Sequence, residues 1–311
     1  MPLELVFLER GKVDLLPYEL APVAADSVCV RTRMTGIRHG EDAHILRQGP
    51  VGCFPYCPLT WGCGEIVAVG EGVTAFQPGE WVHGPMGHRE LQLVPASQLY
   101  MLGWMKPEFS VFIEPGIHGL SCVRRAGIRY GDTVAVVGLG TIGLMALQYI
   151  LASGAREVWA VDPLPRRLEV ARRLGSQHVW RCGMGCGQEE APVEQCEVVI
   201  ELSGLDAGLM TAMSLVKREG ILCGGGERYS REAKVAVESS CRMKATQVRW
   251  IESQNRETGL EELVVYSIAS KQILVWPILS DTVPFAEAPR FYQRLQEKPE
   301  QYVKSILIYP V

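Results

Sequence analysis

Runs of apolar residues that alternate with amphipathic segments dominate the second half of the chain. Strands are predicted where the apolar run is continuous, and helices where apolar residues recur at helical spacing. The predicted strands are 133–137, 158–161, 198–200 and 220–223, and the predicted helices are 142–153, 166–174 and 206–216. Strands that alternate with helices predict an α/β fold, with a doubly wound parallel sheet and helices on both faces.

The first hundred residues follow a different pattern, in which short strands are separated by turn signals. Residues 28–33 alternate apolar and polar side chains, and 64–70 form a strand between glycines. Pro78 and Gly79 mark a turn that feeds a further strand. This pattern predicts a β-rich domain, built as a small irregular barrel.

The C-terminal part returns to the first domain in this interpretation. A helix is predicted at 284–297 and a strand at 303–309, and we expect both to fold back onto the β-rich domain. The expected domains are therefore 1–115 with 275–311 (β-rich) and 116–274 (α/β).

Composition and charge narrow the function classes. The chain has 31 basic and 35 acidic residues, which excludes a general nucleic-acid coat because no strong positive field is present.

Residues 134–155 carry no charge and are long enough to span a bilayer, but glycines inside this stretch separate a strand pattern from a helix pattern. We therefore expect no membrane span. No hydrophobic signal segment opens the sequence, so the ten cysteines are expected to be reduced in the cytoplasm.

A glycine-rich turn lies between the first predicted strand and helix of the α/β half. It reads Gly138-Leu139-Gly140-Thr141-Ile142-Gly143, the GxGxxG pattern. The first glycine allows the tight turn, the second lets the backbone approach a pyrophosphate, and the third lets helix and strand pack closely. Asp162 follows at the end of the second strand, where a carboxylate binds the adenosine ribose and disfavours a 2′-phosphate. The cofactor predicted is NAD, although Arg166 and Arg167 could weaken that preference, and a glycine turn without a nucleotide is the alternative.

With these residues in place the chain resembles the zinc-type alcohol dehydrogenases of the medium-chain dehydrogenase/reductase superfamily. The motifs that carry the resemblance are 64–72, 78–82, Glu114-Pro115 before His118, Asp162 with Arg167, Glu201-Leu202-Ser203-Gly204, 220–224 and Lys304. The resemblance implies a GroES-like catalytic domain and a Rossmann dinucleotide-binding domain. It places Asp162 and Arg167 at the adenosine ribose. It also places Ser203, Gly204 and Gly224 beside the nicotinamide.

The sequence departs from this family at the catalytic zinc. The segment that carries the family's first cysteine ligand here reads GIRHGEDAH, so that Arg38 or His39 holds the cysteine position. Thr60 and Trp61 stand where the family has histidine and glutamate, although another alignment offers Cys63. Threonine and tryptophan do not ligate zinc in protein sites. We therefore expect no metal site.

The structural zinc lobe is absent as well. The chain runs from 84–88 directly into 90–94 without a cysteine. The remaining clusters, which match no ligand pattern of the family, are Cys53 with Cys57 and Cys63, and Cys182 with Cys186. In this respect the chain is similar to zinc-lacking members such as the bacteriochlorophyllide dehydrogenases.

Without zinc, an alcohol carbon still needs a group that takes or gives the hydroxyl proton, and a histidine or a carboxylate does this best. His39 and Glu41 rank first, because they occupy the positions of the missing ligand and of the family's relay hydroxyl. His44 matches the relay histidine, and Glu114 is a further carboxylate at the domain junction. The alternatives are a surface histidine at His44 and a structural carboxylate at Glu114. His83, His88 and His178 follow no pattern and are expected to be structural.

These observations predict a zinc-independent, NAD(H)-dependent oxidoreductase that interconverts a secondary alcohol and a ketone. The charged segment 38–44 suits a polar small molecule, such as a cyclitol, a sugar or a biosynthetic intermediate. One alternative is the reduction of a C=C or C=N bond, for which NADPH would be usual. Another is a non-catalytic, nucleotide-binding homologue. No nucleic-acid or membrane partner is expected, and a homodimer or tetramer is.

Overall fold

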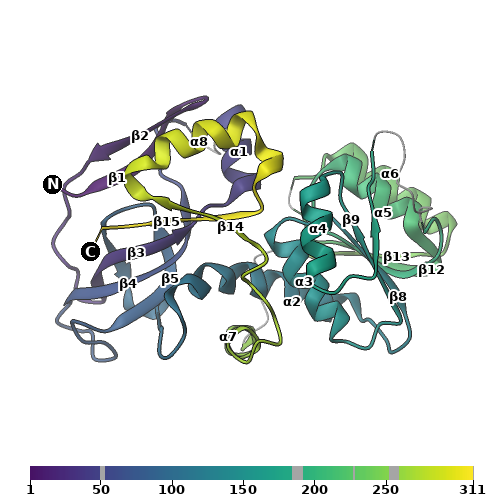
Figure 1. The fold of residues 1–311 in the computed structure, drawn as a ribbon, viewed down its shortest axis with the longest axis horizontal. Coiled ribbons are helices and arrows are strands. Elements are labelled where there is room, and N and C mark those ends of the chain that lie inside the picture. The colour runs from purple at the N-terminus through teal and green to yellow at the C-terminus, as the bar shows by residue number, and fades with distance from the viewer. Residues whose placement is uncertain (50–52, 184–191, 227, 252–258, 311) are drawn as a thin grey trace. The chain divides into compact units, whose positions relative to one another are not determined.

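The computed structural model describes residues 1–49, 53–183, 192–226, 228–251 and 259–310. The chain forms two compact units, unit 1 (Met1–Phe112 with Leu279–Val311) and unit 2 (Ile113–Ile278). Figure 1 shows both units with their elements labelled, and each unit is described by itself.

Unit 1 is built mainly on antiparallel strands. Its strands are β1 (Leu3–Glu9), β2 (Lys12–Pro17), β3 (Ser27–Gly36), β4 (Leu59–Val69), β5 (Trp81–Gly87), β6 (Leu91–Pro95), β7 (Tyr100–Met101), β14 (Leu279–Pro284) and β15 (Lys304–Ile308). β1 and β2 form a hairpin, and the others form one sheet in the order β14-β15-β3-β4-β5-β7, with β6 paired to β3. The long strand β3 pairs with β6 along its first half and with β15 near its end, so it joins the C-terminal strand to the N-terminal part of the unit.

Two longer helices pack on this unit, α1 (His39–Gln48) and α8 (Ala288–Glu297), and lie beside each other in Figure 1. The short helical segments are η1 (Ala96–Gln98), η2 (Pro107–Phe112), η3 (Phe285–Glu287) and η4 (Pro299–Gln301). α8 buries Phe291, Tyr292 and Leu295 in a core that also contains Phe7 and Leu46. Large apolar side chains thus fix α8 and α1 onto the hairpin.

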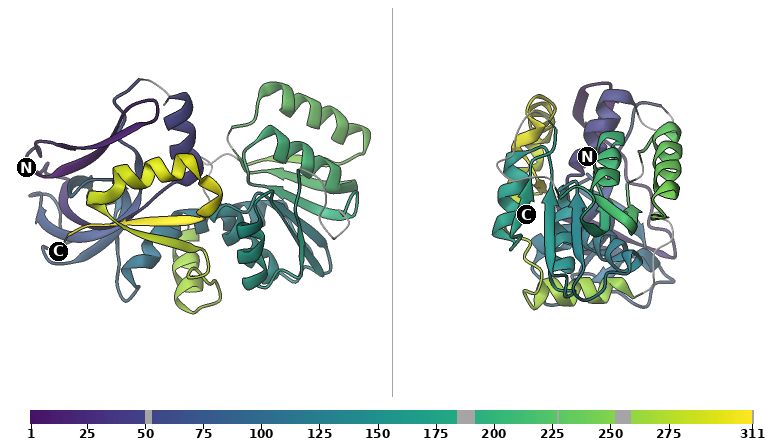
Figure 2. Two further views of the ribbon diagram at one scale, coloured as in Figure 1. Left: turned by 45° about the horizontal axis from the view of Figure 1, so that its top comes forward. Right: turned by 90° about the vertical axis from the view of Figure 1, so that its right-hand side faces the viewer.

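Unit 2 is a parallel sheet between helices. Its strands are β8 (Thr133–Val137), β9 (Glu157–Val161), β10 (His178–Trp180), β11 (Cys196–Glu201), β12 (Val216–Gly224) and β13 (Gln247–Trp250), in the order β10-β9-β8-β11-β12-β13. Its helices are α2 (Ile113–Ala126), α3 (Thr141–Leu151), α4 (Pro165–Arg173), α5 (Asp206–Leu215), α6 (Arg231–Met243) and α7 (Leu260–Ala269). Figure 2 shows α3 and α4 on one face of the sheet and α5 and α6 on the other. The doubly wound parallel sheet is confirmed.

Several predicted boundaries differ from the structure, and two of them change how a segment is interpreted. The helix predicted from residue 284 begins only at Ala288, because Leu279–Pro284 is strand β14, paired in parallel with β15, and a short 3₁₀ turn follows. Proline cannot donate a backbone hydrogen bond, yet it is compatible with the end of a strand at a sheet edge. The strand predicted at 220–223 extends back to Val216.

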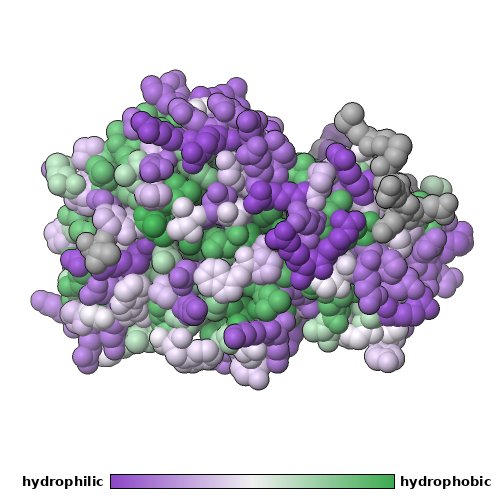
Figure 3. Space-filling model, in the orientation of Figure 1, coloured by the Kyte–Doolittle hydropathy of each residue, from purple (hydrophilic) through white to green (hydrophobic). Residues whose placement is uncertain are grey.

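The uncharged stretch 134–155 is resolved as strand β8, the glycine turn and helix α3. Across the described ranges, none of the helices is both long enough and apolar enough to cross a membrane. Figure 3 shows that hydrophilic residues cover much of the visible face, with smaller hydrophobic areas between them.

Candidate functional site

The carboxyl ends of four strands of unit 2 meet at one edge of the sheet. Val137 pairs in register with both Val161 and Glu201, and Glu201 pairs with Gly224. From β8 the chain proceeds to β9 on one side, while β11 lies on the other side. This is the point where the strand order reverses, which is where ligands bind in open α/β sheets.

The glycine turn at this point is tightly packed at Gly138 and Gly143 and open at Gly140. Gly138 has a φ of +90°, and a side chain there would overlap the backbone of Ser203. A Cβ atom on Gly143 would overlap the carbonyl oxygen of Gly138, whereas one on Gly140 would meet no atom within 4 Å in the part of the chain that the structure describes. Gly140 is also the N-cap of α3 and has no side chain to occupy the first-turn N–H groups. The turn therefore fits a pyrophosphate at the helix N-terminus.

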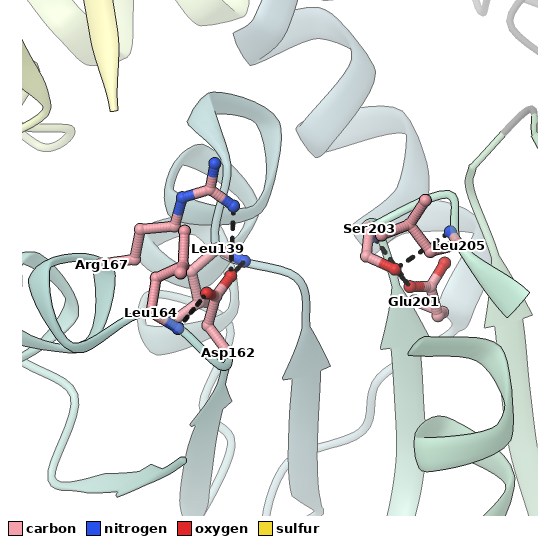
Figure 4. A network of polar contacts seen from close by, with 7 residues as sticks. All are labelled: Leu139, Asp162, Leu164, Arg167, Glu201, Ser203 and Leu205. Carbon is pink, nitrogen blue, oxygen red and sulfur yellow. Dashed lines mark hydrogen bonds and ion pairs between the residues drawn. The ribbon is translucent and has the colours of Figure 1, made fainter. Parts of the chain in front are cut away.

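Asp162 is tied to this turn. Its carboxylate accepts hydrogen bonds from the backbone N–H of Leu139 (2.7 Å) and of Leu164 (2.8 Å), and Arg167 Nη1 lies 3.4 Å away (Figure 4). Asp162 is buried, and the buried Nε atom of Arg167 has no hydrogen-bond partner among the described residues. Each carboxylate oxygen accepts more than one hydrogen bond, so Asp162 keeps capacity for ribose hydroxyls. These residues fit the adenosine half of a dinucleotide.

A second buried carboxylate, Glu201, organises the neighbouring turn and was not singled out from the sequence. It accepts hydrogen bonds from Ser203 N (2.8 Å) and Ser203 Oγ (Figure 4). It also accepts from Gly204 N (3.2 Å) and Tyr229 Oη. Tyr229 Oη also accepts from Gly226 N (2.9 Å). Burial raises the pKa of Glu201, although its hydrogen bonds act in the opposite direction.

Through these contacts Glu201 fixes the Ser203–Gly204 turn against Gly138. Gly224 lies in the adjoining strand, where the ring of Trp250 fills the space beside it. An acidic residue at the carboxyl end of a buried parallel strand is the signal by which sequence reasoning could have found Glu201.

The acid–base candidates of unit 1 lie at the start of α1. Glu41 is half-exposed and forms an ion pair with Arg38. The ring of His39, the first residue of α1, lies 6.4 Å from that of Phe291 and 6.2 Å from that of Tyr302 (centroid distances), within the aromatic core. His44 is half-buried on the same helix. The structure thus places these three residues on one helix, each of them partly buried.

Asp42 is a buried acidic residue of this helix and is not among the acid–base candidates ranked from the sequence. Its Oδ2 accepts hydrogen bonds from Tyr292 Oη (2.7 Å) and from the backbone N–H of Arg38 (3.2 Å). Burial raises the pKa of Asp42 from 3.8 to about 6, against the opposing effect of Tyr292 and Arg38. Asp42 therefore joins α1 to α8.

We expect Asp42→Asn to stabilise the protein above pH 6. Because the pKa of Asp42 is raised in the folded state, its contribution to stability is complete below about pH 4 and is lost as the pH rises through 6. The loss amounts to about 3 kcal/mol, and asparagine avoids it while still accepting from Tyr292. Chemical denaturation should show equal free energies of unfolding for the two proteins at pH 4 and a more stable variant at pH 8. Glu41→Gln is the control, and an Asp42→Asn variant that is no more stable than the wild type at pH 8 would contradict this assignment.

The residues at the family's zinc-ligand positions make contacts with other parts of the protein. Thr60 Oγ1 donates a hydrogen bond to the carbonyl oxygen of Gly36, and Trp61 stacks on Tyr100. The buried Cys63 thiol contacts Pro107 O (3.6 Å), and burial raises its pKa to about 12. Within the described ranges, no group of three or more His, Cys, Asp or Glu side chains is arranged to hold a metal ion.

Two further candidates are placed elsewhere. Glu114 lies in unit 2, in the first turn of α2, and is partly buried. Cys182 is half-buried with a pKa that burial raises, and its proposed neighbour Cys186 lies outside the described residues.

Comparison with known proteins decides the family. D-guloside 3-dehydrogenase of Escherichia coli (strain K12) is 30% identical over 339 residues, covering 93% of this chain and 95% of the relative. The chain belongs to the medium-chain dehydrogenase/reductase superfamily of zinc-type alcohol dehydrogenases. This medium-chain dehydrogenase is an alcohol dehydrogenase-like oxidoreductase. The alignment is longer than the chain itself, so the relative contains segments that this dehydrogenase lacks.

Other comparisons agree with this assignment. An uncharacterized zinc-type alcohol dehydrogenase-like protein of Escherichia coli (strain K12), YdjJ, is 27% identical, covering 66% of this chain and 69% of the relative. The crystal structure of 2R,3R-butanediol dehydrogenase from Bacillus subtilis superimposes with a TM-score of 0.85 over 100% of both chains, at 18% identity, and confirms the fold of this medium-chain dehydrogenase. No protein-family model matches the chain.

Proposed function

We propose that this medium-chain dehydrogenase uses NAD(H), without zinc, to interconvert a secondary alcohol and a ketone on a hydroxylated small molecule such as a sugar or cyclitol. The observation that carries the proposal is the glycine turn with Asp162 fastened beneath it. The substrate class is supported by the relative named as a D-guloside 3-dehydrogenase. A homodimer or tetramer, formed by a second copy at the β13 edge of the sheet, is part of the proposal.

When bound, the nicotinamide supplies hydride transfer to and from the substrate carbon. The chain holds the pyrophosphate at the N–H groups of α3 and the adenosine ribose at Asp162. Ser203 and Gly204, set in place by Glu201, border the turn on its other side. Glu41 is our candidate for the group that takes the hydroxyl proton in alcohol oxidation and returns it in ketone reduction.

The proposal is tested by a turnover screen. The purified protein is incubated with NAD⁺ and a panel of sugars, cyclitols and simple alcohols, and separately with NADH and ketones, enones and imines. Oxidation of hydroxylated substrates supports the proposal. Enone or imine reduction without alcohol oxidation would favour the C=C or C=N alternative, and tight NADH binding without any turnover would favour a non-catalytic homologue. Unchanged turnover in both His39→Gln and Glu41→Gln would remove these residues as acid–base candidates.

Zinc independence has its own test. The residues at the family's ligand positions do not fit a zinc ion, since Thr60 is bonded to the backbone and the Cys63 thiol is buried with a raised pKa. Metal analysis of protein purified without chelator is expected to give no stoichiometric zinc. About one zinc per chain would overturn this part of the proposal.

Cofactor preference is expected to shift in Asp162→Asn. The substitution removes the negative charge that repels a 2′-phosphate and keeps one acceptor for the backbone, while Arg167 becomes available to the phosphate. We expect the preference for NADH over NADPH, measured as the ratio of dissociation constants, to fall by about 10-fold or about 1.4 kcal/mol. The double variant Asp162→Asn/Arg167→Gln is the control and should lose most of the gain for NADPH. An unchanged ratio in Asp162→Asn would show that the ribose does not lie beside Asp162.

A further inference from the structure

Five buried side chains of unit 1 form an unbroken line of hydrogen bonds. Tyr292 Oη lies 2.7 Å from Asp42 Oδ2 and 3.4 Å from His88 Nε2. On the other side of the imidazole, His88 Nδ1 lies 2.7 Å from Thr35 Oγ1, which lies 2.9 Å from Tyr309 Oη. None of the five residues is more than 7% exposed. They come from α1, α8, the segment after β5, strand β3 and the segment after β15, so the line crosses the unit.

With Asp42 ionised, the hydrogens of the line have one consistent order. Tyr292 donates to the carboxylate and therefore accepts from His88 at Nε2. His88 Nδ1 then has to accept from Thr35, whose oxygen accepts from Tyr309. Every hydrogen has an acceptor, and His88 carries its hydrogen on Nε2.

With Asp42 protonated, the order is reversed. The Asp42 hydroxyl donates to Tyr292, Tyr292 donates to His88 Nε2, and His88 donates from Nδ1 to Thr35. Thr35 in turn donates to Tyr309. The two states differ by one proton and by the nitrogen of His88 that carries the hydrogen.

His88 stays neutral in both states. Burial, together with the nearby Lys304 ammonium, lowers the pKa of His88 to about 3. It therefore passes a hydrogen by exchanging its tautomer, and it does not become a cation in the neutral pH range.

We propose that Asp42, Tyr292, His88, Thr35 and Tyr309 form a proton relay that loads and unloads Asp42 during the alcohol–ketone reaction. The proposal rests on the proposed function. To load Asp42, Tyr292 gives it a proton and takes one from His88 Nε2. His88 Nδ1 takes a proton from Thr35, Thr35 takes one from Tyr309, and Tyr309 takes one from a solvent acid (hydronium or a buffer acid), which is left as its conjugate base. Unloading runs the same steps in reverse.

The relay serves both directions of the reaction. In ketone reduction, for which a bound nicotinamide would supply the hydride, the carbonyl oxygen takes a proton that Asp42 replaces through the acid–base residue of α1, for which Glu41 is our candidate. In oxidation, the hydroxyl proton returns by the same path. Asp42 is thus a positioning and proton-storing residue, which acts through another group.

The charges around the line are compatible with one proton moving along it. Asp42 faces Arg38 and Glu41 of α1 and the phenol of Tyr56, as well as Tyr292 of α8. Lys304 of β15 acts on His88, and the pKa of Tyr309 is raised first by burial and then by Glu90 and Tyr18. Because the pKa of Asp42 is about 6, both states of the line are populated near neutral pH.

The test is the tautomer of His88 in the full-length protein. The chain has six histidines, so ¹⁵N-histidine labelling with long-range ¹H–¹⁵N correlation spectra resolves the rings, and a His88→Gln variant assigns the signal. We expect the Nε2–H tautomer at pH 8, the Nδ1–H tautomer at pH 5 and a neutral ring at both. One tautomer at both pH values, or a cationic ring at pH 5, would overturn the relay.

Tyr292→Phe is the matched variant, because it removes one oxygen and keeps the packed ring. It separates His88 from Asp42, so the tautomer should no longer change with pH. Thr35→Val interrupts the line on the other side of the imidazole and should have the same effect. Either variant behaving like the wild type would contradict the proposal.

Kinetics separates this inference from the proposed function. In Tyr292→Phe, kcat for ketone reduction by NADH should fall about 10-fold with KM unchanged, and the limb of the pH profile due to Asp42 should be lost. Unchanged kcat and pH profile in an active enzyme would overturn the relay and leave the proposed function intact. If the wild type shows no dehydrogenase turnover, the proposed function fails, and with it the catalytic role of the relay, whatever the tautomers show.

Discussion

Gly140→Val is expected to weaken NADH binding by about 100-fold or more, or about 3 kcal/mol, while leaving the fold intact. A Cβ atom at this position would meet no atom of the described residues within 4 Å, and the backbone φ of −67° suits valine. The new methyl groups would instead fill the space in which a pyrophosphate approaches the turn. Fluorescence titration with NADH measures the affinity. Thermal and chemical denaturation without the nucleotide should show a free energy of unfolding within about 1 kcal/mol of the wild type.

Gly143→Ala provides the contrast. Here the added methyl group would overlap the carbonyl oxygen of Gly138, so the backbone has to move. We expect a loss of about 1–3 kcal/mol in the free energy of unfolding together with the loss of binding. If Gly140→Val bound NADH as tightly as the wild type, the pyrophosphate could not lie over this turn.

Glu201→Ala is expected to reduce the free energy of unfolding by about 3–5 kcal/mol. The carboxylate is fully buried and accepts from the backbone of Ser203 and Gly204 and from the hydroxyls of Ser203 and Tyr229. Alanine leaves these donors without their acceptor. Chemical denaturation at pH 8 measures the loss, and NADH affinity should fall with it, since the turn beside Gly138 is no longer held.

Two control substitutions show how much of the loss in the free energy of unfolding is due to the buried network of Glu201. Glu201→Gln keeps a carbonyl acceptor and should lose less than alanine does. Glu169→Ala removes an exposed glutamate that pairs with Arg173 on α4 and should change the free energy of unfolding by about 0.5 kcal/mol or less. A Glu201→Ala protein as stable as the Glu169→Ala protein would show that the buried network does not hold the turn.

The fold of unit 2 could be predicted because the apolar pattern of its strands and helices agrees with the position of the glycine motif between them. The predicted strand 133–137 is β8, and the GxGxxG motif stands between it and α3 as its physical role requires. Strand β14 was missed because its six residues, Leu279–Pro284, include a serine, an aspartate and a threonine and show no apolar run. This segment becomes a strand only because it pairs in parallel with β15, which lies about twenty residues further along the chain.

The buried polar groups could not be ranked from the sequence for a related reason. Asp42 stands among Glu41 and His44 with nothing to distinguish it, and His88 follows no motif. Their importance arises from Tyr292, which lies 250 positions after Asp42 and 204 positions after His88 and contacts both. Glu201, in contrast, could have been inferred, because it directly follows the predicted buried strand 198–200. The expected roles of His39, Glu41, His44 and Glu114 remain predictions for the kinetic experiments.

The hydrogen bonds that Leu139 and Leu164 donate to Asp162 affect how the cofactor preference of such enzymes can change in evolution. One carboxylate both holds the backbone of Leu139 and Leu164 and, in our proposal, excludes a 2′-phosphate. A lineage that exchanged it for a small apolar residue would admit the phosphate, but it would also leave two backbone N–H groups without their acceptor, at about 1–3 kcal/mol each. Exchange of Asp162 for a small apolar residue would therefore cost stability that a second mutation has to restore, whereas asparagine, which keeps one acceptor, offers a less costly route.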